Sequence, residues 1–173
     1  GFCVFNDLTV AALTLLGEGA VKRVAVVDLD VHQGDGNAAL LTAHPNVLVV
    51  SVHGEKNFPF RKVASDIDLG LPDNTDDDAY LAALAPVLER VAAFRLDIVL
   101  YLSGADPLKS DRLGRLDLTF EGLVARDRMV FQLARRLGVP VSIAIGGGYA
   151  DPITDSVEAY ANTFVMARQV LRV

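Results

Sequence analysis

Short aliphatic runs alternate with longer amphipathic stretches along most of the chain. Runs typical of buried strands stand at 23–30, 47–53, 98–102 and 141–145. The stretches between them repeat apolar residues every three to four positions, which is the helical pattern. Longer helices are therefore predicted at about 77–94, 120–137 and 153–171. This alternation predicts an α/β fold with three α/β/α layers, in which helices cover both faces of a mainly parallel sheet.

Weaker signals complete the predicted order of elements. Asn6 or Asp7 is placed to cap a helix before the first strand, and a short helix is expected at about 37–42. The weak alternation of polar and apolar residues at 65–71 predicts an edge strand. Pro86 lies inside the first of the long helices. We expect it to kink or split that helix, because proline lacks an amide N–H.

Composition narrows the class of protein. The chain has 173 residues, 51% of them hydrophobic, and no repeat or linker, which predicts a single folded domain over residues 1–173. A net charge of −6 argues against direct binding of nucleic acid. No apolar run approaches the roughly 20 residues that span a bilayer, and no signal peptide is present. Cys3 is the single cysteine, which excludes an internal disulfide. We interpret it as a buried thiol in a reducing, cytoplasmic compartment.

The stretch VVDLDVHQGDG, residues 26–36, carries the clearest chemistry. Side chains two apart on a strand share a face, so Asp28, Asp30 and His32 align where a buried strand ends. Buried unpaired charge is costly, and a cation removes that cost. Carboxylate and imidazole together suit zinc, and open α/β sheets place their sites beyond the carboxyl ends of strands. The alternative interpretation is structural, because aspartates at strand ends also cap helices and hold loops.

Two further strands end in polar or glycine-rich segments. Asp106 follows 98–102, and the turn Gly146–Tyr149 follows 141–145. The carboxyl ends of parallel strands share one edge, so Asp106 is expected to be a third ligand, leaving a fourth zinc position open for water or substrate. Glycines let the backbone approach a ligand closely, and Tyr149 is placed to donate to a developing oxyanion. Taken singly, Asp106 is more typical of a turn and Tyr149 of a packing residue.

Four motifs together resemble the histone deacetylase family, within the arginase/deacetylase fold. They are GFCVFND at the start, DLDVHQGDG, SGAD followed by SDRLGRL, and GGGY. The resemblance spans nearly the whole chain, and DVHQGDG with ADPLKSDRLG is most similar to the class IV branch. It implies that the chain is the C-terminal portion of a deacetylase catalytic domain. It also implies zinc held by Asp30, His32 and Asp106, with Tyr149 as the hydrogen-bond donor to the transition state.

The same resemblance assigns substrate and cation contacts. The residues that match the walls and floor of an acyl-lysine tunnel are Gly1, Phe2, Phe58 and Gly147. A monovalent cation, such as K⁺, would be held by the side chains of Asp28 and Ser51 and the carbonyls of Asp30, His32 and Val52.

Two departures from the family pattern limit the expected activity. Phe60 stands where the family usually has glycine, which affects the placement of Phe58. The family's tandem histidine pair precedes the GFC segment, whereas this chain starts at Gly1 without a methionine, as if cut. Asp28 and Asp35 match the catalytic carboxylates that orient that pair. Without it we expect them to be buried acids that lack partners, with pKa values raised by desolvation.

The sequence therefore predicts a zinc-dependent deacetylase acting on an acylated lysine peptide or acylated amine. For this chain alone it predicts metal binding with little or no hydrolysis. One alternative is a binuclear manganese ureohydrolase, although Gly34, Gly104 and Leu108 stand where its extra carboxylates belong. Another is a non-enzymatic module that binds acyl-lysine. A sheet without its N-terminal strands would expose an edge and apolar surface, so we also expect self-association.

Overall fold

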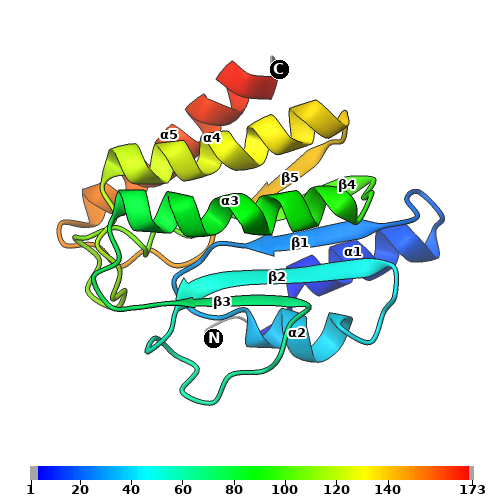
Figure 1. Cartoon of the computed structure of the whole chain (residues 1–173), viewed down its shortest axis with the longest axis horizontal. Helices are drawn as coiled ribbons and strands as arrows, with labels where there is room; N and C mark the ends of the chain where they lie inside the picture. The colour runs from blue at the N-terminus through cyan, green and yellow to red at the C-terminus, as the bar shows by residue number, and fades with distance from the viewer. Residues whose placement is uncertain (1–3, 172–173) are drawn as a thin grey trace.

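A computed structural model describes residues 4–171, and these contain one five-stranded sheet. Its strands are β1 (Val24–Asp28), β2 (Val47–Gly54), β3 (Ile67–Leu71), β4 (Ile98–Leu102) and β5 (Val141–Ala144). The strand order is β3-β2-β1-β4-β5, and every pairing is parallel. All strands therefore end at the same edge of the sheet, and the strand arrows in Figure 1 point toward that edge.

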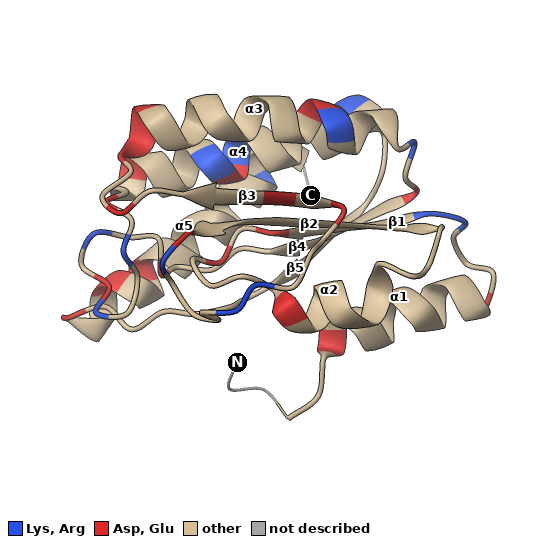
Figure 2. Cartoon of the chain, turned by 60° about the horizontal axis from the view of Figure 1, so that its bottom comes forward, with Lys and Arg blue, Asp and Glu red and all other residues tan. Residues whose placement is uncertain are grey.

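Helices cover both faces of this sheet, which confirms the predicted three-layer α/β architecture. The helices are α1 (Asp7–Gly17), α2 (Asp35–Leu41), α3 (Asp77–Ala93), α4 (Phe120–Leu137) and α5 (Ile153–Leu171). Helices α3 and α4 lie over one face, with α5 packed against α4, and α1 and α2 lie on the opposite face (Figures 1 and 2). The Asn6 side chain caps α1 by accepting a hydrogen bond from the amide of Thr9.

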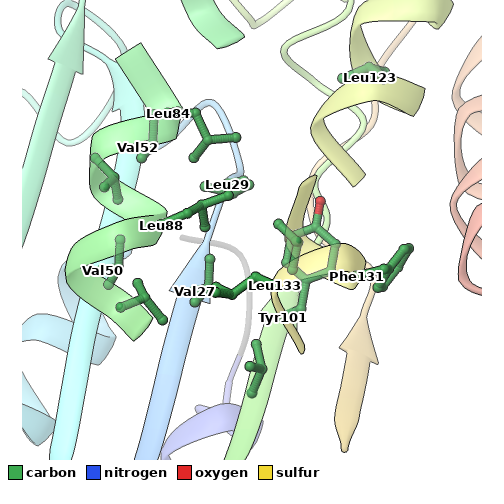
Figure 3. Close-up of a cluster of buried hydrophobic side chains, with 14 of the residues drawn as sticks. Val27, Leu29, Val50, Val52, Leu84, Leu88, Tyr101, Leu123, Phe131 and Leu133 are labelled. Atoms are coloured by element: carbon green, nitrogen blue, oxygen red, sulfur yellow. The ribbon is translucent and has the colours of Figure 1, made fainter. Parts of the chain in front are cut away.

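The hydrophobic core has two parts because both faces of β1 are buried. Ala25 and Val27 belong to the larger cluster under α3 and α4, whereas Val24 and Val26 belong to the smaller one beside α1. Figure 3 shows the larger cluster, where the ring of Tyr101 on β4 packs edge to face against Phe131 on α4. The centroids of the two rings are 5.8 Å apart. A strand covered on both sides has no polar face, which explains its continuous aliphatic run.

The predicted split at Pro86 is wrong, because α3 is one continuous helix from Asp77 to Ala93, and the alternative of a kink stays a prediction. Pro86 leaves the carbonyl of Ala82 without its helical donor, but both residues are exposed, so water can bond that carbonyl. The buried side chains of Leu84 and Leu88 hold the same helix on the sheet. Burial of one face therefore outweighs the loss of a hydrogen bond on the other.

Among the residues described, no helix is both long enough and apolar enough to cross a membrane. Gly1, Phe2 and Cys3 lie outside the described residues, so the structure does not address the roles predicted for them.

Candidate metal centre

Asp30, His32 and Asp106 converge at the carboxyl edge of the sheet. Each offers a ligand atom, and these atoms lie within 4.8 Å of one another. Nδ1 of His32 is 3.1 Å from Oδ1 of Asp30 and 3.0 Å from Oδ2 of Asp106. The first two residues follow β1 and the third follows β4, and these strands are neighbours in register. The sequence-predicted convergence of the three side chains is therefore present.

The electrostatics of this group favour a bound cation. Asp30 is 7% exposed and Asp106 is 0% exposed. Burial, together with the charge of Asp30, raises the pKa of Asp106 to about 7. Burial disfavours the charge of His32, but its hydrogen bonds to Asp106 and Asp30 outweigh this and raise its pKa to about 10. A proton on His32 thus plays the part of a cation between two buried carboxylates, and a divalent ion fits the same donor set.

Backbone amides hold both carboxylates in place. Oδ1 of Asp106 accepts a hydrogen bond from the amide of Val31 at 2.9 Å. Oδ1 of Asp30 accepts one from the amide of His32 at 2.9 Å, and its Oδ2 accepts one from the amide of Gly147 at 2.6 Å. These bonds link the segments that follow β1, β4 and β5. The oxygens of both candidate ligands are consequently held in a fixed orientation by the protein itself.

Two glycines stand where side chains would collide with the candidate ligands. A Cβ on Gly147 would overlap Oδ2 of Asp106, and one on Gly104 would lie 2.6 Å from Cα of Asp30. Close approach of the backbone therefore explains these glycines. The structure places Gly147 against the two carboxylates, and its contact with substrate stays a prediction.

Asp28 is buried behind the ligands, as predicted, but it has partners. Its Oδ1 accepts a hydrogen bond from the amide of Asp30, and its Oδ2 accepts one from the side chain of Asn37 at 3.4 Å. Burial and then the charge of Asp30 raise the pKa of Asp28 well above its ordinary value. The expectation of a buried acid with a raised pKa is confirmed for Asp28, and the expectation that it lacks partners is wrong.

The prediction that Asp35 is a buried acid is wrong. Helix α2 begins at Asp35, two residues before the predicted start, and Asp35 in its first turn is only half-buried. Its Oδ1 accepts a hydrogen bond from the amide of Gly36.

Ser51 pairs with Asp28 across β1 and β2, so two of the residues predicted to bind a monovalent cation are strand neighbours. Ser51 and Val52 are both buried. The Ser51 hydroxyl lies 3.0 Å from Nδ1 of His53 and accepts a hydrogen bond from the amide of Gly34. No bound ion tests this group, so its cation role stays a prediction.

Tyr149 is held through its backbone by the loop that follows Asp106. Its amide donates to Oδ2 of Asp111 at 2.6 Å, and its carbonyl accepts from the amide and the Nε of Arg112 at 3.3 Å each. The Oδ1 of Asp111 also accepts from the amides of Leu113 and Gly114. One carboxylate therefore joins the SDRLG loop to the GGGY turn. The predicted role of the Tyr149 phenol is not tested by these contacts.

Phe58 lies on the loop between β2 and β3 and is half exposed. Its ring packs edge to face against that of Phe60, with 6.0 Å between the ring centroids. Phe60, which departs from the family pattern, therefore packs against Phe58, the residue predicted to line the tunnel. Lys62 holds this loop by donating to the carbonyls of Asn57 and Pro59.

Sequence reasoning missed two residues that organise this edge. The hydroxyl of Tyr160 on α5 donates to the carbonyl of Gly147 at 2.6 Å and accepts from the amides of Ala105 and Gly146. Arg126 on α4 is fully buried and bonds carbonyls at the ends of β1 and β4. Both residues reach the site from helices that are distant in sequence. The sequence carried a sign of a special role only for Arg126, which is a charged residue on the apolar face of a predicted helix.

Comparison with known proteins places these motifs in context. The family model described as the histone deacetylase domain matches residues 1–164. An uncharacterized protein of Picosynechococcus is 45% identical over 98% of this chain and 57% of its own length. Histone deacetylase 2 of Arabidopsis thaliana is 32% identical over 91% of this chain and 43% of its own length.

A solved structure shares the fold. The crystal structure of acetylpolyamine aminohydrolase from Burkholderia pseudomallei matches 98% of this chain with a TM-score of 0.85 and 26% sequence identity. The match covers 51% of that protein. The chain thus spans about half the length of each of these three proteins.

Proposed function

Because the chain belongs to the histone deacetylase domain family, we propose that it forms the metal-bearing part of a zinc-dependent deacetylase domain. The reaction is hydrolysis of the amide bond in an acylated lysine peptide or an acylated amine. The observation that carries this proposal is the group of Asp30, His32 and Asp106, with ligand atoms within 4.8 Å of one another. Three protein ligands of these types are typical of catalytic zinc sites that keep one position open.

Each site residue has a proposed role. Asp30, His32 and Asp106 would hold zinc, which supplies Lewis acidity for the attack of water on the amide carbonyl. Tyr149 would donate a hydrogen bond to the oxygen that becomes negative in the transition state. Asp28 and Asp35 would each orient a catalytic imidazole.

The acyl chain and a second cation have their own proposed contacts. Gly1, Phe2, Phe58 and Gly147 would line the acyl chain. K⁺ would be held by Asp28, Ser51 and the carbonyls of Asp30, His32 and Val52. The pairing of Asp28 with Ser51 across two strands supports that placement.

The proposed substrate class rests on the similar proteins, and the proposed family branch rests on two sequence motifs. The structural match to an acetylpolyamine aminohydrolase supports an acylated amine, and the identity with a histone deacetylase supports an acylated lysine. The motifs DVHQGDG and ADPLKSDRLG support the class IV branch.

Hydrolysis also needs a base that takes a proton from the attacking water. The two histidines outside the ligand group are poorly placed for that task. His44 precedes β2 and so lies at the opposite edge of the sheet. His53 is buried beside Ser51, and burial lowers its pKa. We therefore propose that these 173 residues alone bind zinc but hydrolyse an acetyl-lysine peptide poorly.

A binuclear manganese site is less favoured. Within residues 4–171 the metal-capable group has three members, and Gly34, Gly104 and Leu108 offer no further carboxylate. The other alternative, a non-enzymatic module that binds acyl-lysine, is also less favoured, because all three candidate metal ligands are present.

Titration of zinc into the metal-free chain tests the proposal. We expect one zinc per chain, and we expect a hydroxamate to bind only when zinc is present. Asp106→Asn should weaken zinc binding at least 100-fold, whereas Asp78→Asn makes the same chemical change at an exposed position and should leave it unaltered. Absence of zinc uptake, or equal uptake by the Asp106 variant, would overturn the proposal. Two manganese ions per chain would favour the binuclear alternative.

Turnover of an acetyl-lysine peptide with added zinc tests the poor hydrolysis separately. Substantial activity that is abolished by Asp30→Ala would refute that part alone.

A further inference from the structure

Arg126 is a charged residue buried between α4 and the sheet, where it is 1% exposed. Its guanidinium donates to three backbone carbonyls. Nη1 bonds Gly104 at 2.7 Å and Leu29 at 3.3 Å, and Nη2 bonds Ser103 at 3.0 Å. These carbonyls lie just beyond β1 and β4, past the last register pair of the two strands.

The guanidinium is itself fixed in orientation. Asp127, the next residue on α4, accepts from Nε of Arg126 at 2.9 Å and lies 2.8 Å from its Nη2. Asp127 in turn accepts from the hydroxyl of Tyr101 on β4 at 2.5 Å and from Thr163 on α5 at 2.6 Å. The positive charge of Arg126 is therefore balanced by Asp127. The five N–H groups of its guanidinium bond acceptors on α4 and at the ends of β1 and β4.

Packing alone does not explain a charged pair here, because apolar residues of similar volume often replace a buried ion pair without loss of stability. The carbonyls give the physical reason for an arginine. Leu29 immediately precedes Asp30, and Gly104 stands two residues before Asp106. No apolar side chain can bond these buried carbonyls, and a buried carbonyl without a donor is costly. The planar guanidinium spans both strand ends at a fixed spacing.

We propose that Arg126 is a positioning residue for the metal centre. It acts through backbone carbonyls to set the distance between the strand end that carries Asp30 and His32 and the one that carries Asp106. This inference rests on the proposed function, because a fixed spacing matters to ligands that share one ion.

Three variants separate positioning from simple packing. Arg126→Met keeps an apolar stem and removes every donor, and Arg126→Lys keeps a charge that cannot span three carbonyls. Leu133→Ala is the control, because Leu133 is buried on the same helix at 4% exposure and its truncation destabilises the chain without touching the strand ends. The free energy of unfolding of each metal-free variant is measured so that affinities are compared at known stability.

The first readout is metal affinity, measured by competition with a chromophoric chelator, together with the visible spectrum of bound Co²⁺. Arg126→Met should alter the Co²⁺ spectrum and weaken zinc binding by up to about 10- to 100-fold, the range for groups that bond metal ligands directly, because Arg126 acts through the neighbouring carbonyls. Arg126→Lys should fall between Arg126→Met and the parent. Leu133→Ala should keep the parent affinity and spectrum despite its lower stability.

The second readout needs no metal. Hydrogen exchange of the metal-free chain should be faster at the amides of 29–31 and 103–105 in Arg126→Met, and unchanged there in Leu133→Ala. If Arg126→Met fails to fold, Arg126→Lys carries both comparisons. The positioning role would be overturned if a folded Arg126 variant kept both the zinc affinity and the hydrogen-exchange rates of the parent. It would also be overturned if Leu133→Ala lost as much zinc affinity as Arg126→Met. If the parent chain binds no metal, the proposed function fails, and the exchange comparison still decides whether Arg126 holds the strand ends.

Discussion

Nδ1 of His32 lies 3.0 Å from Oδ2 of Asp106, although 74 positions separate the two residues in the chain. Strand pairing makes this contact possible. Val24 to Asp28 on β1 pairs in parallel with Ile98 to Leu102 on β4, so the segments that follow both strands leave the sheet side by side. The contact therefore depends on register, and a slip of one residue would turn the ligands to opposite faces.

Zinc should stabilise the folded chain, because it binds a group formed only in the native state. At a zinc concentration about 100 times the dissociation constant, the gain is about 2.7 kcal/mol, which corresponds to a rise in Tm of about 5–10 °C for a chain of this size. A chelator should reverse the rise. Differential scanning calorimetry of the parent and of Asp106→Asn measures the effect, and a rise of the same size in both would contradict the assigned ligands.

Gly147→Ala should disrupt the ligand group, because the added Cβ would overlap Oδ2 of Asp106. Overpacking of this kind costs about 1–3 kcal/mol in the free energy of unfolding, and we expect weaker zinc binding as well. Gly17→Ala is the matched control, since nothing lies within 4 Å of its Cβ position at the end of α1. Denaturant unfolding and zinc titration test both variants. Parent-like zinc binding by the Gly147 variant would show that this backbone can move aside.

The convergence of the three candidate ligands could be predicted from sequence because their signal is local. Asp30 and His32 follow an aliphatic run directly, and Asp106 follows another after SGA. A parallel sheet brings such ends to one edge whatever the strand order. The order itself, with β1 between β2 and β4, has no local signal, because it depends on which strands pair over long distances.

Residues that act across elements were harder to predict. Tyr160 lies seven residues into α5 and reaches back to Gly147, so only the packing of α5 against α4 reveals its contact. Helix α2 starts at Asp35 with Gly34 at the N-cap position and without a side-chain capping bond, so the sequence carried no capping signal for this start. Pro86 is a further case, because tertiary burial of α3 overrides the intrinsic effect of proline.

Asp111→Ala should loosen the turn that carries Tyr149. The buried carboxylate accepts from the amides of Leu113, Gly114 and Tyr149, and its loss leaves them without an acceptor. We expect a cost of about 1–3 kcal/mol in the free energy of unfolding. Hydroxamate affinity of the zinc-loaded chain should fall while zinc affinity holds, because the ligands stay anchored elsewhere. Isothermal titration with both compounds separates these effects.

The control for this loop is Asp117→Ala, which removes the half-buried partner of the exposed Lys109 and should change neither affinity. Equal hydroxamate affinity in the parent and the Asp111 variant would contradict a link between the loop and the site.

Self-association is expected from the face of the sheet that α1 leaves partly open. An apolar groove of about 670 Å³ lies between α1 and the strands β4 and β5, and Val10 and Leu100 are among the residues that line it. Val10 and Phe5, which both line it, are 60% and 82% exposed, and Ser142 on the edge strand β5 also lines it. Contiguous apolar surface beside a strand edge favours pairing with a second copy, because both copies then remove that surface from water.

Sedimentation velocity at micromolar concentration measures this association. We expect the parent chain to form dimers or larger species, and we expect the double variant Phe5→Asp and Val10→Asp to sediment as a monomer, because burying the new charges in the contact is costly. Val157→Asp is the control, since Val157 is 64% exposed on α5 and does not line the groove. A parent chain that sediments as a clean monomer would refute the prediction, and dissociation by Val157→Asp alone would place the contact on α5 instead.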